Sequence, residues 1–229
     1  MNELSILIGG KAGFGIDKAS LVIAGLVGRL GYRRYIYRDY PSLIRGGHTF
    51  SIIRVSADKV YTHRDRIDVL LALNQDTIDL HKARLKSGGI IIYDSDVVKP
   101  ETVAEVKGAI GLPMTGIIKE EGAGEIMRNA CMIGAFTRSV GIGWDVLEAV
   151  FKKNFSNETD RNLKVARMAF DASKELIALE SPAKEKLPLV TGNEAVALGL
   201  IKAGLKSYIA YPMTPSSPIL HYLASLAEA

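Results

Sequence analysis

The chain has 229 residues, of which 48% are hydrophobic and 24% are charged. These are ordinary values for a globular protein, and the length allows one sizeable domain or one domain with part of another. No apolar run approaches the roughly 20 residues of a membrane span, and the N-terminus lacks the pattern of a signal peptide. The single cysteine, Cys131, excludes an internal disulfide and a complete cysteine-ligated iron–sulfur cluster within this chain. Together these features predict a cytoplasmic protein.

The net charge of +4 is unevenly distributed along the sequence. Residues 1–70 contain eleven Lys and Arg against six Asp and Glu. A basic half of this kind can attract nucleic acid, a phosphorylated cofactor or an acidic protein. Because the sequence has no basic helix, zinc-ligand spacing or aromatic ribonucleoprotein pattern, we expect no nucleic-acid partner.

The first 39 residues have the pattern of a strand, a glycine loop, a helix and a second strand. The apolar run Leu4–Ile8 predicts the strand, and residues 9–15 form the loop. From Ile16 onward, apolar residues recur at steps of three and four, which predicts one packing face of a helix. Gly31 is a natural helix terminator, and the second strand is expected at residues 34–39.

The glycine loop is the first candidate binding site. A glycine loop that feeds a helix N-terminus exposes backbone N–H groups to which an anionic group can bind. The same glycines can also serve only to let a strand turn into a helix. The residues Gly13 to Lys18 begin like the dinucleotide fingerprint, but Lys18 stands in its third glycine position. Asp39 occurs where the fingerprint has an acidic residue that hydrogen-bonds the NAD ribose, but Arg38 lies beside it. NAD(P) binding therefore stays an alternative.

Strands and helices alternate in the middle of the chain. We expect a strand at 50–55, a turn at Asp58–Lys59 with a return through Val60 and Tyr61, a buried strand at 67–73, a helix at 76–85 and a strand at 90–94. This alternation predicts a three-layer α/β/α fold, with a Rossmann-like, mostly parallel sheet that ends in an edge hairpin.

The last third of the sequence is predominantly helical. We predict helices at 124–140, 144–155 and 160–179, followed by a charged and proline-marked linker at 180–188. After the linker we predict a helix at 195–203 that begins with a capping box at Thr191–Glu194. A strand at 207–210 and a last helix from about 218 follow. The part from 189 to 229 cannot bury a core alone. We therefore expect a first domain at 1–179 and the truncated start of a second α/β domain at 189–229.

Two groups of motifs together resemble a known family. Residues 9–15 and the segment Tyr-Pro-Ser-Leu-Ile-Arg-Gly-Gly at 40–47 resemble the gamma domain of 2-oxoacid:ferredoxin oxidoreductases, and Asn129 with its helix fits the later part of that domain. Residues 192–195, followed by Tyr-Pro-Met-Thr-Pro-Ser at 211–216, resemble the start of the alpha domain, which binds the thiamine diphosphate pyrimidine. The order gamma, linker, alpha resembles the fused large subunit of the 2-oxoglutarate, 2-oxoisovalerate or pyruvate type.

The resemblance implies a function and roles for several residues. Enzymes of this family decarboxylate a 2-oxoacid on thiamine diphosphate with Mg²⁺, pass electrons through [4Fe-4S] clusters to ferredoxin and release acyl-CoA. By resemblance, Thr214 would contact the substrate carboxylate. The loop residues Gly10, Lys11, Gly13 and Gly15, together with Arg45, could serve the phosphates of CoA. Arg45 could equally form an interdomain ion pair.

The resemblance also implies that this chain needs partners. The Gly-Asp-Gly segment that binds thiamine diphosphate and Mg²⁺ is missing, as are cluster cysteines. In the family these belong to the beta subunit or to other domains, so we expect no metal site and no activity in the isolated chain. The expected partners are the beta subunit, the remainder of the alpha domain and ferredoxin, and exposed alpha-domain surface suggests a homodimer. The alternatives are a stand-alone nucleotide-binding module and a non-catalytic assembly scaffold whose basic half docks partner subunits.

Overall fold

The computed structural model describes residues 2–39, 46–155, 158–182, 184–213 and 215–226. The chain divides into a first unit, residues 1–187, and a second unit, residues 188–229. Within the described ranges, no helix is both long and apolar enough to cross a membrane. Two predicted site residues, Arg45 and Thr214, lie outside the described residues, as does most of the 40–47 segment.

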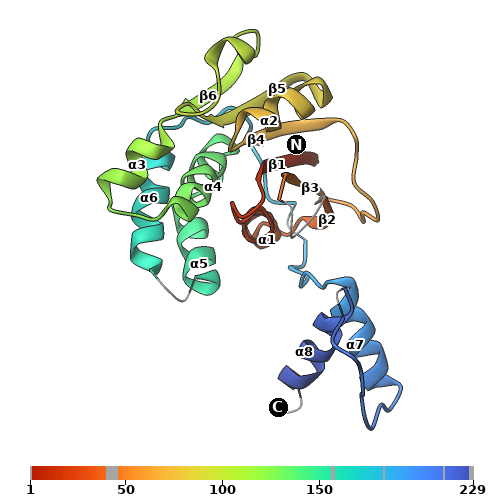
Figure 1. Ribbon diagram of the computed structural model, residues 1–229. Helices are drawn as coiled ribbons and strands as arrows, with labels where there is room; N and C mark the ends of the chain where they lie inside the picture. The colour runs from red at the N-terminus through yellow and green to blue at the C-terminus, as the bar shows by residue number, and fades with distance from the viewer. Residues whose placement is uncertain (1, 40–45, 156–157, 183, 214, 227–229) are drawn as a thin grey trace. The chain divides into compact units, whose positions relative to one another are not determined.

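The first unit contains the sheet and most of the helices (Figure 1). The strands are β1 (Glu3–Lys11), β2 (Arg33–Asp39), β3 (His48–Ser56), β4 (Ile67–Ala72), β5 (Leu85–Asp94) and β6 (Gly108–Leu112). The helices are α1 (Ile16–Arg29), α2 (Gln75–His81), α3 (Met114–Glu120), α4 (Arg128–Ser139), α5 (Trp144–Asn154) and α6 (Thr159–Asp171), with short 3₁₀ turns η1 (Lys82–Arg84), η2 (Pro100–Thr102) and η3 (Glu125–Met127).

The sheet has six strands in the order β2-β3-β1-β4-β5-β6. Strand β3 is antiparallel to both of its neighbours, β1 and β2, whereas β1, β4, β5 and β6 pair in parallel. The predicted mostly parallel sheet with an edge hairpin is confirmed, but the hairpin is β2–β3. The predicted return through Val60 and Tyr61 is wrong, because residues 60–61 form no strand and Tyr61 is 78% exposed.

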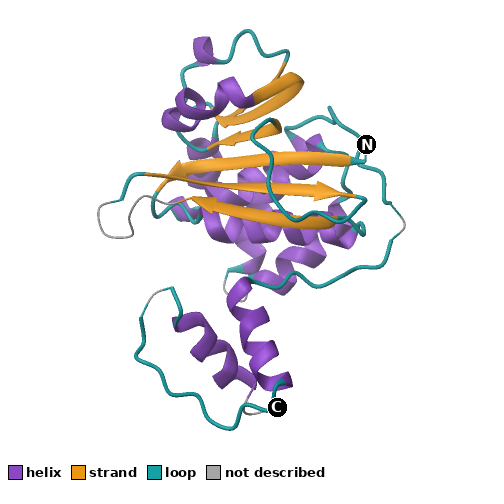
Figure 2. Ribbon diagram, turned by 90° about the vertical axis from the view of Figure 1, so that its right-hand side faces the viewer, coloured by secondary structure: helices purple, strands orange, loops and turns teal. Residues whose placement is uncertain are grey.

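Two hydrophobic layers hold the sheet between helices. One face packs against α1, α4, α5 and α6, which lie together behind the sheet in Figure 2, and this layer contains Phe136 and Phe151 among its fully buried side chains. The other face is smaller and packs against α2 and the η2 region through Ile78, Val98 and Val103. The observed arrangement is therefore the three-layer α/β/α fold that alternation of strands and helices predicts.

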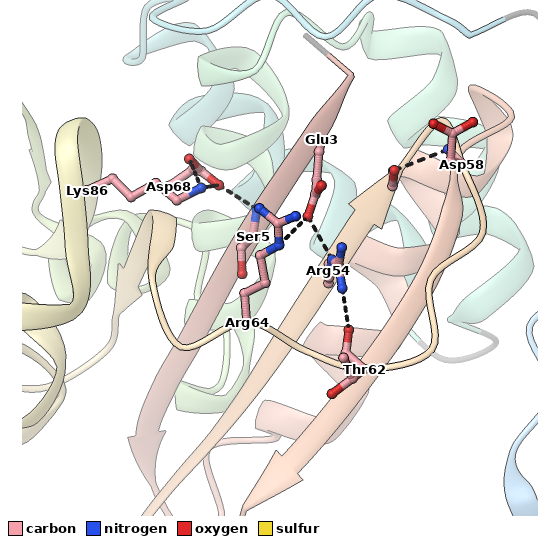
Figure 3. A network of polar contacts seen from close by, with 9 residues as sticks. Glu3, Ser5, Arg54, Asp58, Thr62, Arg64, Asp68 and Lys86 are labelled. Atoms are coloured by element: carbon pink, nitrogen blue, oxygen red, sulfur yellow. Dashed lines mark hydrogen bonds and ion pairs between the residues drawn. The ribbon is translucent and has the colours of Figure 1, made fainter.

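A polar network anchors the loop at 57–66 to the amino end of β1 (Figure 3). Glu3 forms ion pairs with Arg54 at 2.7 Å and with Arg64 at 2.9 Å. Arg54 also donates a hydrogen bond to the carbonyl of Thr62 at 3.2 Å. These contacts hold the loop after β3 against the amino end of β1.

Other differences from the sequence-based expectations lie at element ends. Strand β6 was not predicted, because its five residues include two glycines and only three apolar side chains. Helix α6 ends at Asp171 rather than at 179, and Leu176, Ile177 and Leu179 instead donate backbone hydrogen bonds to carbonyls at the end of α4, Ser139 and Val140. The predicted helix at 76–85 ends at His81 and continues as η1, so that Leu85 begins β5.

The second unit contains two helices in its described part, α7 (Gly192–Lys202) and α8 (Ser217–Leu226). The predicted capping box is confirmed: the Glu194 N–H donates to Thr191 Oγ1 at 3.2 Å, and the Thr191 N–H donates to the Glu194 carboxylate at 2.7 Å. The predicted strand at 207–210 is wrong. A strand needs a neighbouring strand to satisfy its backbone, and Ile209 is 96% exposed.

Candidate functional site

The chain changes direction at the carboxyl ends of β1 and β4. After β1 the chain passes through the glycine loop into α1 on one face of the sheet, and after β4 it enters α2 on the other face. α/β proteins bind ligands at the carboxyl ends of neighbouring parallel strands whose connections leave on opposite faces. We refer to this place, at the carboxyl ends of β1 and β4, as the crevice. The Leu73 N–H donates to the Gly9 carbonyl at 3.1 Å and joins the two strand ends.

The glycine loop, residues 11–15, is a tight turn at this crevice. Gly13 and Gly15 have positive φ angles of 92° and 70°, which favour glycine because a Cβ atom is strained there. The Phe14 N–H donates to the Lys11 carbonyl at 3.0 Å, and the Ala12 N–H donates to the Gly47 carbonyl at 2.8 Å. Within the described residues, no loop contact uses the N–H groups of Gly13 or Gly15.

Gly15 also provides room for a side chain from α4. A Cβ atom at Gly15 would lie 2.8 Å from Asn129 Nδ2 and 2.9 Å from Ile126 Cδ1, which are closer than real contacts allow. The Asn129 amide donates a hydrogen bond to the Phe14 carbonyl. The sequence analysis assigned Asn129 only to the later part of the gamma domain. In the structure, its hydrogen bond to Phe14 holds the glycine loop just before α1 begins.

Two lysines lie on either side of the loop glycines Gly13 and Gly15 in the sequence. Lys11 is exposed at the end of β1, and Lys18 lies in the first turns of α1, where its Nζ donates to the Asn154 carbonyl at 2.7 Å. Asp17 does not cap the helix, whose N-cap residue is Gly15, but it forms an ion pair with Arg38 at 3.7 Å. Of the predicted phosphate-binding residues, the structure brings Lys11, Gly13 and Gly15 together, and Gly10 is buried within β1.

A histidine pair beside the crevice was not foreseen from the sequence. His48 Nε2 and His81 Nε2 lie 2.9 Å apart. Arg84 Nη1 lies 3.4 Å from His81 Nδ1 and can only donate, so that His81 carries its proton on Nε2 and donates it to His48. Burial lowers the pKa of His81 to about 4, with the neighbouring His48 and Arg84 adding to the effect, and burial also lowers the pKa of His48. Both rings are therefore neutral at pH 7.

A second unforeseen pair lies at the carboxyl end of β5. Asp94 is fully buried, and its Oδ2 lies 3.7 Å from Arg128 Nε at the start of α4. Arg128 also donates from Nη2 to Thr115 at 3.0 Å, and the Asp96 N–H donates to Asp94 Oδ1 at 3.1 Å. Burial raises the pKa of Asp94, and the Arg128 charge acts in the opposite direction.

The cysteine and the possible metal ligands add no further chemistry to this site. Cys131 is buried in α4, and burial raises the pKa of its thiol to about 12. A thiol of this kind is unreactive, because the thiolate is the nucleophile. In the described part of the chain, no three His, Cys, Asp or Glu side chains are grouped so that they could hold a metal ion.

The fold, the crevice and the glycine loop define a member of a known enzyme family. Residues 5–172 match the family of pyruvate ferredoxin/flavodoxin oxidoreductases. The chain belongs to this family, as the motifs at 9–15 and 40–47 predicted.

Particular relatives agree with this assignment. The chain is 26% identical to the alpha subunit of 2-oxoacid:ferredoxin oxidoreductase 2 from Aeropyrum pernix, over 95% of this chain and 42% of the relative. It is 27% identical to the 2-oxoglutarate synthase subunit KorC from Archaeoglobus fulgidus, over 76% of this chain and 90% of the relative.

A solved structure is similar over the whole chain. The 2-oxoglutarate:ferredoxin oxidoreductase from Magnetococcus marinus, solved with 2-oxoglutarate, coenzyme A and succinyl-CoA bound, matches with a TM-score of 0.82 and 26% identity, over 100% of this chain and 42% of that one. The chain thus spans about two fifths of the length of the alpha-subunit relatives that it matches.

Proposed function

We propose that this chain is part of a 2-oxoacid:ferredoxin oxidoreductase. The reaction joins the acyl group of a 2-oxoacid to the sulfur of CoA, releases CO₂ and a proton, and passes two electrons to ferredoxin. Support comes from the family match over residues 5–172 and from relatives that bear this name. The single observation that carries the role of the first unit is the glycine loop at the crevice between β1 and β4.

The first unit, as the gamma domain, contributes a site for the phosphates of CoA in this proposal. Among the described residues, no hydrogen bond uses the N–H groups of Gly13 and Gly15. Together with the N-terminus of the 14-residue helix α1, such groups suit a negative charge. Lys11 adds an exposed cation at the same edge. Asn129 keeps the loop in place by its hydrogen bond to Phe14.

The second unit is proposed to be the start of the alpha domain. Its capping box and the motif at 211–216 occur in the order expected for that domain. Thr214, by resemblance, would contact the substrate carboxylate. The described part of the chain has no group of three His, Cys, Asp or Glu side chains that could hold a metal ion. We therefore assign no step of the reaction to residues that would hold thiamine diphosphate, Mg²⁺ or the [4Fe-4S] clusters. The beta subunit, the rest of the alpha domain and ferredoxin are the proposed partners.

Calorimetric titration of the chain with CoA tests the proposed phosphate site. We expect binding in the micromolar range, about 1–100 μM, and a dissociation constant about fivefold higher for Lys11→Ala, because one charge-assisted contact is lost. Lys59→Ala is the matched control, since Lys59 is an exposed lysine of the 57–66 loop. Equal affinities for the two variants would contradict the loop assignment.

The same titration separates the alternatives. Binding of a nicotinamide nucleotide, but not of CoA, would favour a stand-alone NAD(P)-binding module. If neither binds, Lys11 and the loop act by packing against partner subunits. Loss of partner binding on charge reversal of Lys11, with CoA affinity unchanged, would favour the assembly scaffold.

A further inference from the structure

The segment between the two units follows a defined path on the surface of the first unit. Residues 180–182 and 184–187 run beside the end of α1 and the start of β2, and they belong to the first unit. Most of the contacts use backbone carbonyls of the segment as acceptors. Tyr32 Oη donates to the Glu180 carbonyl at 2.8 Å, and Arg33 Nη1 donates to the Glu185 carbonyl at 3.1 Å. Ser181 Oγ donates in return to the Leu30 carbonyl at 2.8 Å.

Arg34 makes the contact at the end of the segment. Its Nη2 donates to the Leu187 carbonyl at 2.7 Å. To reach that carbonyl, the guanidinium crosses α1 at Gly28, where an added Cβ atom would lie 1.9 Å from Nη1 and 2.6 Å from Cζ. Only glycine at position 28 leaves room for this path. The side chains of residues 32–34 therefore each donate a hydrogen bond to one backbone carbonyl of the segment.

A second anchor lies in the middle of the segment. Lys184 Nζ donates to the Ala57 carbonyl at 2.5 Å and forms an ion pair with Asp58 at 3.0 Å. The backbone of Lys184 also passes close to Gly31, where an added Cβ atom would lie 2.6 Å from the Lys184 carbonyl oxygen. The segment is thus held from α1, β2 and the loop after β3.

From these contacts we propose that residues 32–34, Gly28, the Ala57 carbonyl and the Asp58 carboxylate form a docking site for the segment of this same chain that comprises residues 180–182 and 184–187. A charged segment of this length would otherwise be a flexible linker. Docking fixes the point at which the chain leaves the first unit. That point lies at the carboxyl end of α1, about 21 Å from the glycine loop at its other end.

The docking site has a function of its own in this chain. The KorC relative from Archaeoglobus fulgidus corresponds to 76% of this chain and is a separate subunit. Here the chain continues into a second unit from residue 188, and the docked segment shortens the part of the connection that is free to move. This inference rests on contacts within the first unit and needs no CoA.

The test compares two glycine substitutions in one helix. Gly28→Ala places a methyl group where the Arg34 guanidinium lies, whereas Gly25→Ala meets only Val150 Cγ1 at an ordinary 3.5 Å. Both changes raise helix propensity, so a general gain or loss of helix stability affects them alike. Arg34→Ala removes the contact directly and serves if Gly28→Ala perturbs folding, which is checked by thermal unfolding.

Two measurements report on the docked segment in the full chain. Trypsin cleavage after Lys186 should be about fivefold to tenfold faster in Gly28→Ala and Arg34→Ala than in wild type or Gly25→Ala, because cleavage follows the released population and a charged hydrogen bond is lost. A nitroxide on Lys186→Cys reports mobility, and it labels this position alone because Cys131 is buried with a raised pKa.

The outcomes are distinct. Faster cleavage and a more mobile nitroxide in Gly28→Ala and Arg34→Ala, with Gly25→Ala unchanged, would support the docking site. Equal cleavage and equal mobility in all four proteins would overturn it. CoA binding plays no part in either readout, so failure of the proposed phosphate site leaves this test intact.

Discussion

Removal of Arg128 should destabilise the first unit strongly, because it leaves the buried Asp94 without its cation. The two charged groups approach to 3.7 Å, and their side chains are 13% and 0% exposed. At an effective dielectric constant of about 20, two unit charges at this separation attract by about 4.5 kcal/mol. Removing one partner of a buried pair typically costs about 3–5 kcal/mol, so we expect Arg128→Ala to lower the free energy of unfolding by about 3 kcal/mol.

The pH dependence follows from the direction of the Asp94 pKa. Burial raises this pKa in the folded state, and loss of the Arg128 charge raises it further. Between the unfolded and folded values, the folded state binds more protons than the unfolded state, so stability falls as pH rises. The cost of Arg128→Ala should accordingly be smallest below about pH 4, where Asp94 is protonated in both states, and should grow toward neutral pH.

Urea unfolding at pH 4, 6 and 8, followed by circular dichroism, measures this effect. Lys152→Ala is the control, because Lys152 forms an exposed ion pair with Glu148, and such pairs contribute about 0.5 kcal/mol or less. Asp94→Asn in the Arg128→Ala background should recover part of the lost stability, since it removes the unpaired charge. A cost below 1 kcal/mol at pH 8, or no recovery by Asp94→Asn, would refute the reasoning.

Three further experiments test the loop, the buried cysteine and the second unit. Gly15→Ala should weaken CoA binding and cost about 1–3 kcal/mol of stability, because it strains a positive φ and displaces Asn129; Gly124→Ala, which meets no atom within 4 Å, is the calorimetric control. Cys131 should resist iodoacetamide at pH 8 in the folded chain and react once urea unfolds it. In the complete enzyme, Thr214→Ala should lower turnover with little change in melting temperature, and unchanged steady-state kinetics would remove Thr214 from the active site.

Local patterns predicted the elements whose stability is local. The spacing of apolar residues from Ile16 located α1 to within one or two residues, and the Thr191–Glu194 spacing identified the cap of α7. In both cases the physical cause lies within one or two helical turns of sequence. The glycine loop was also found this way, because a strand, a run of glycines and a helix follow one another directly.

Pairings between distant segments could not be read from the sequence. His48 and His81 are 33 residues apart, and the Asn129 amide contacts a carbonyl 115 residues earlier. The position of β3 between β1 and β2 depends on sheet pairing rather than on its own residues, which is why a local return through Val60 and Tyr61 was predicted instead. The interpretation of 180–188 as a linker rested on composition. Composition does not show that backbone carbonyls of this segment accept hydrogen bonds from residues 32–34.

The two ends of α1 contact different parts of the first unit. Its amino end begins at Gly15, where Asn129 enters and the loop faces the crevice, and its carboxyl end passes Gly28, where the Arg34 guanidinium crosses to Leu187. Each end depends on a glycine that admits a side chain from a different element. Because the docked segment contacts the carboxyl end of α1 and the glycine loop lies at its amino end, the docking site and the proposed phosphate site use opposite ends of one helix.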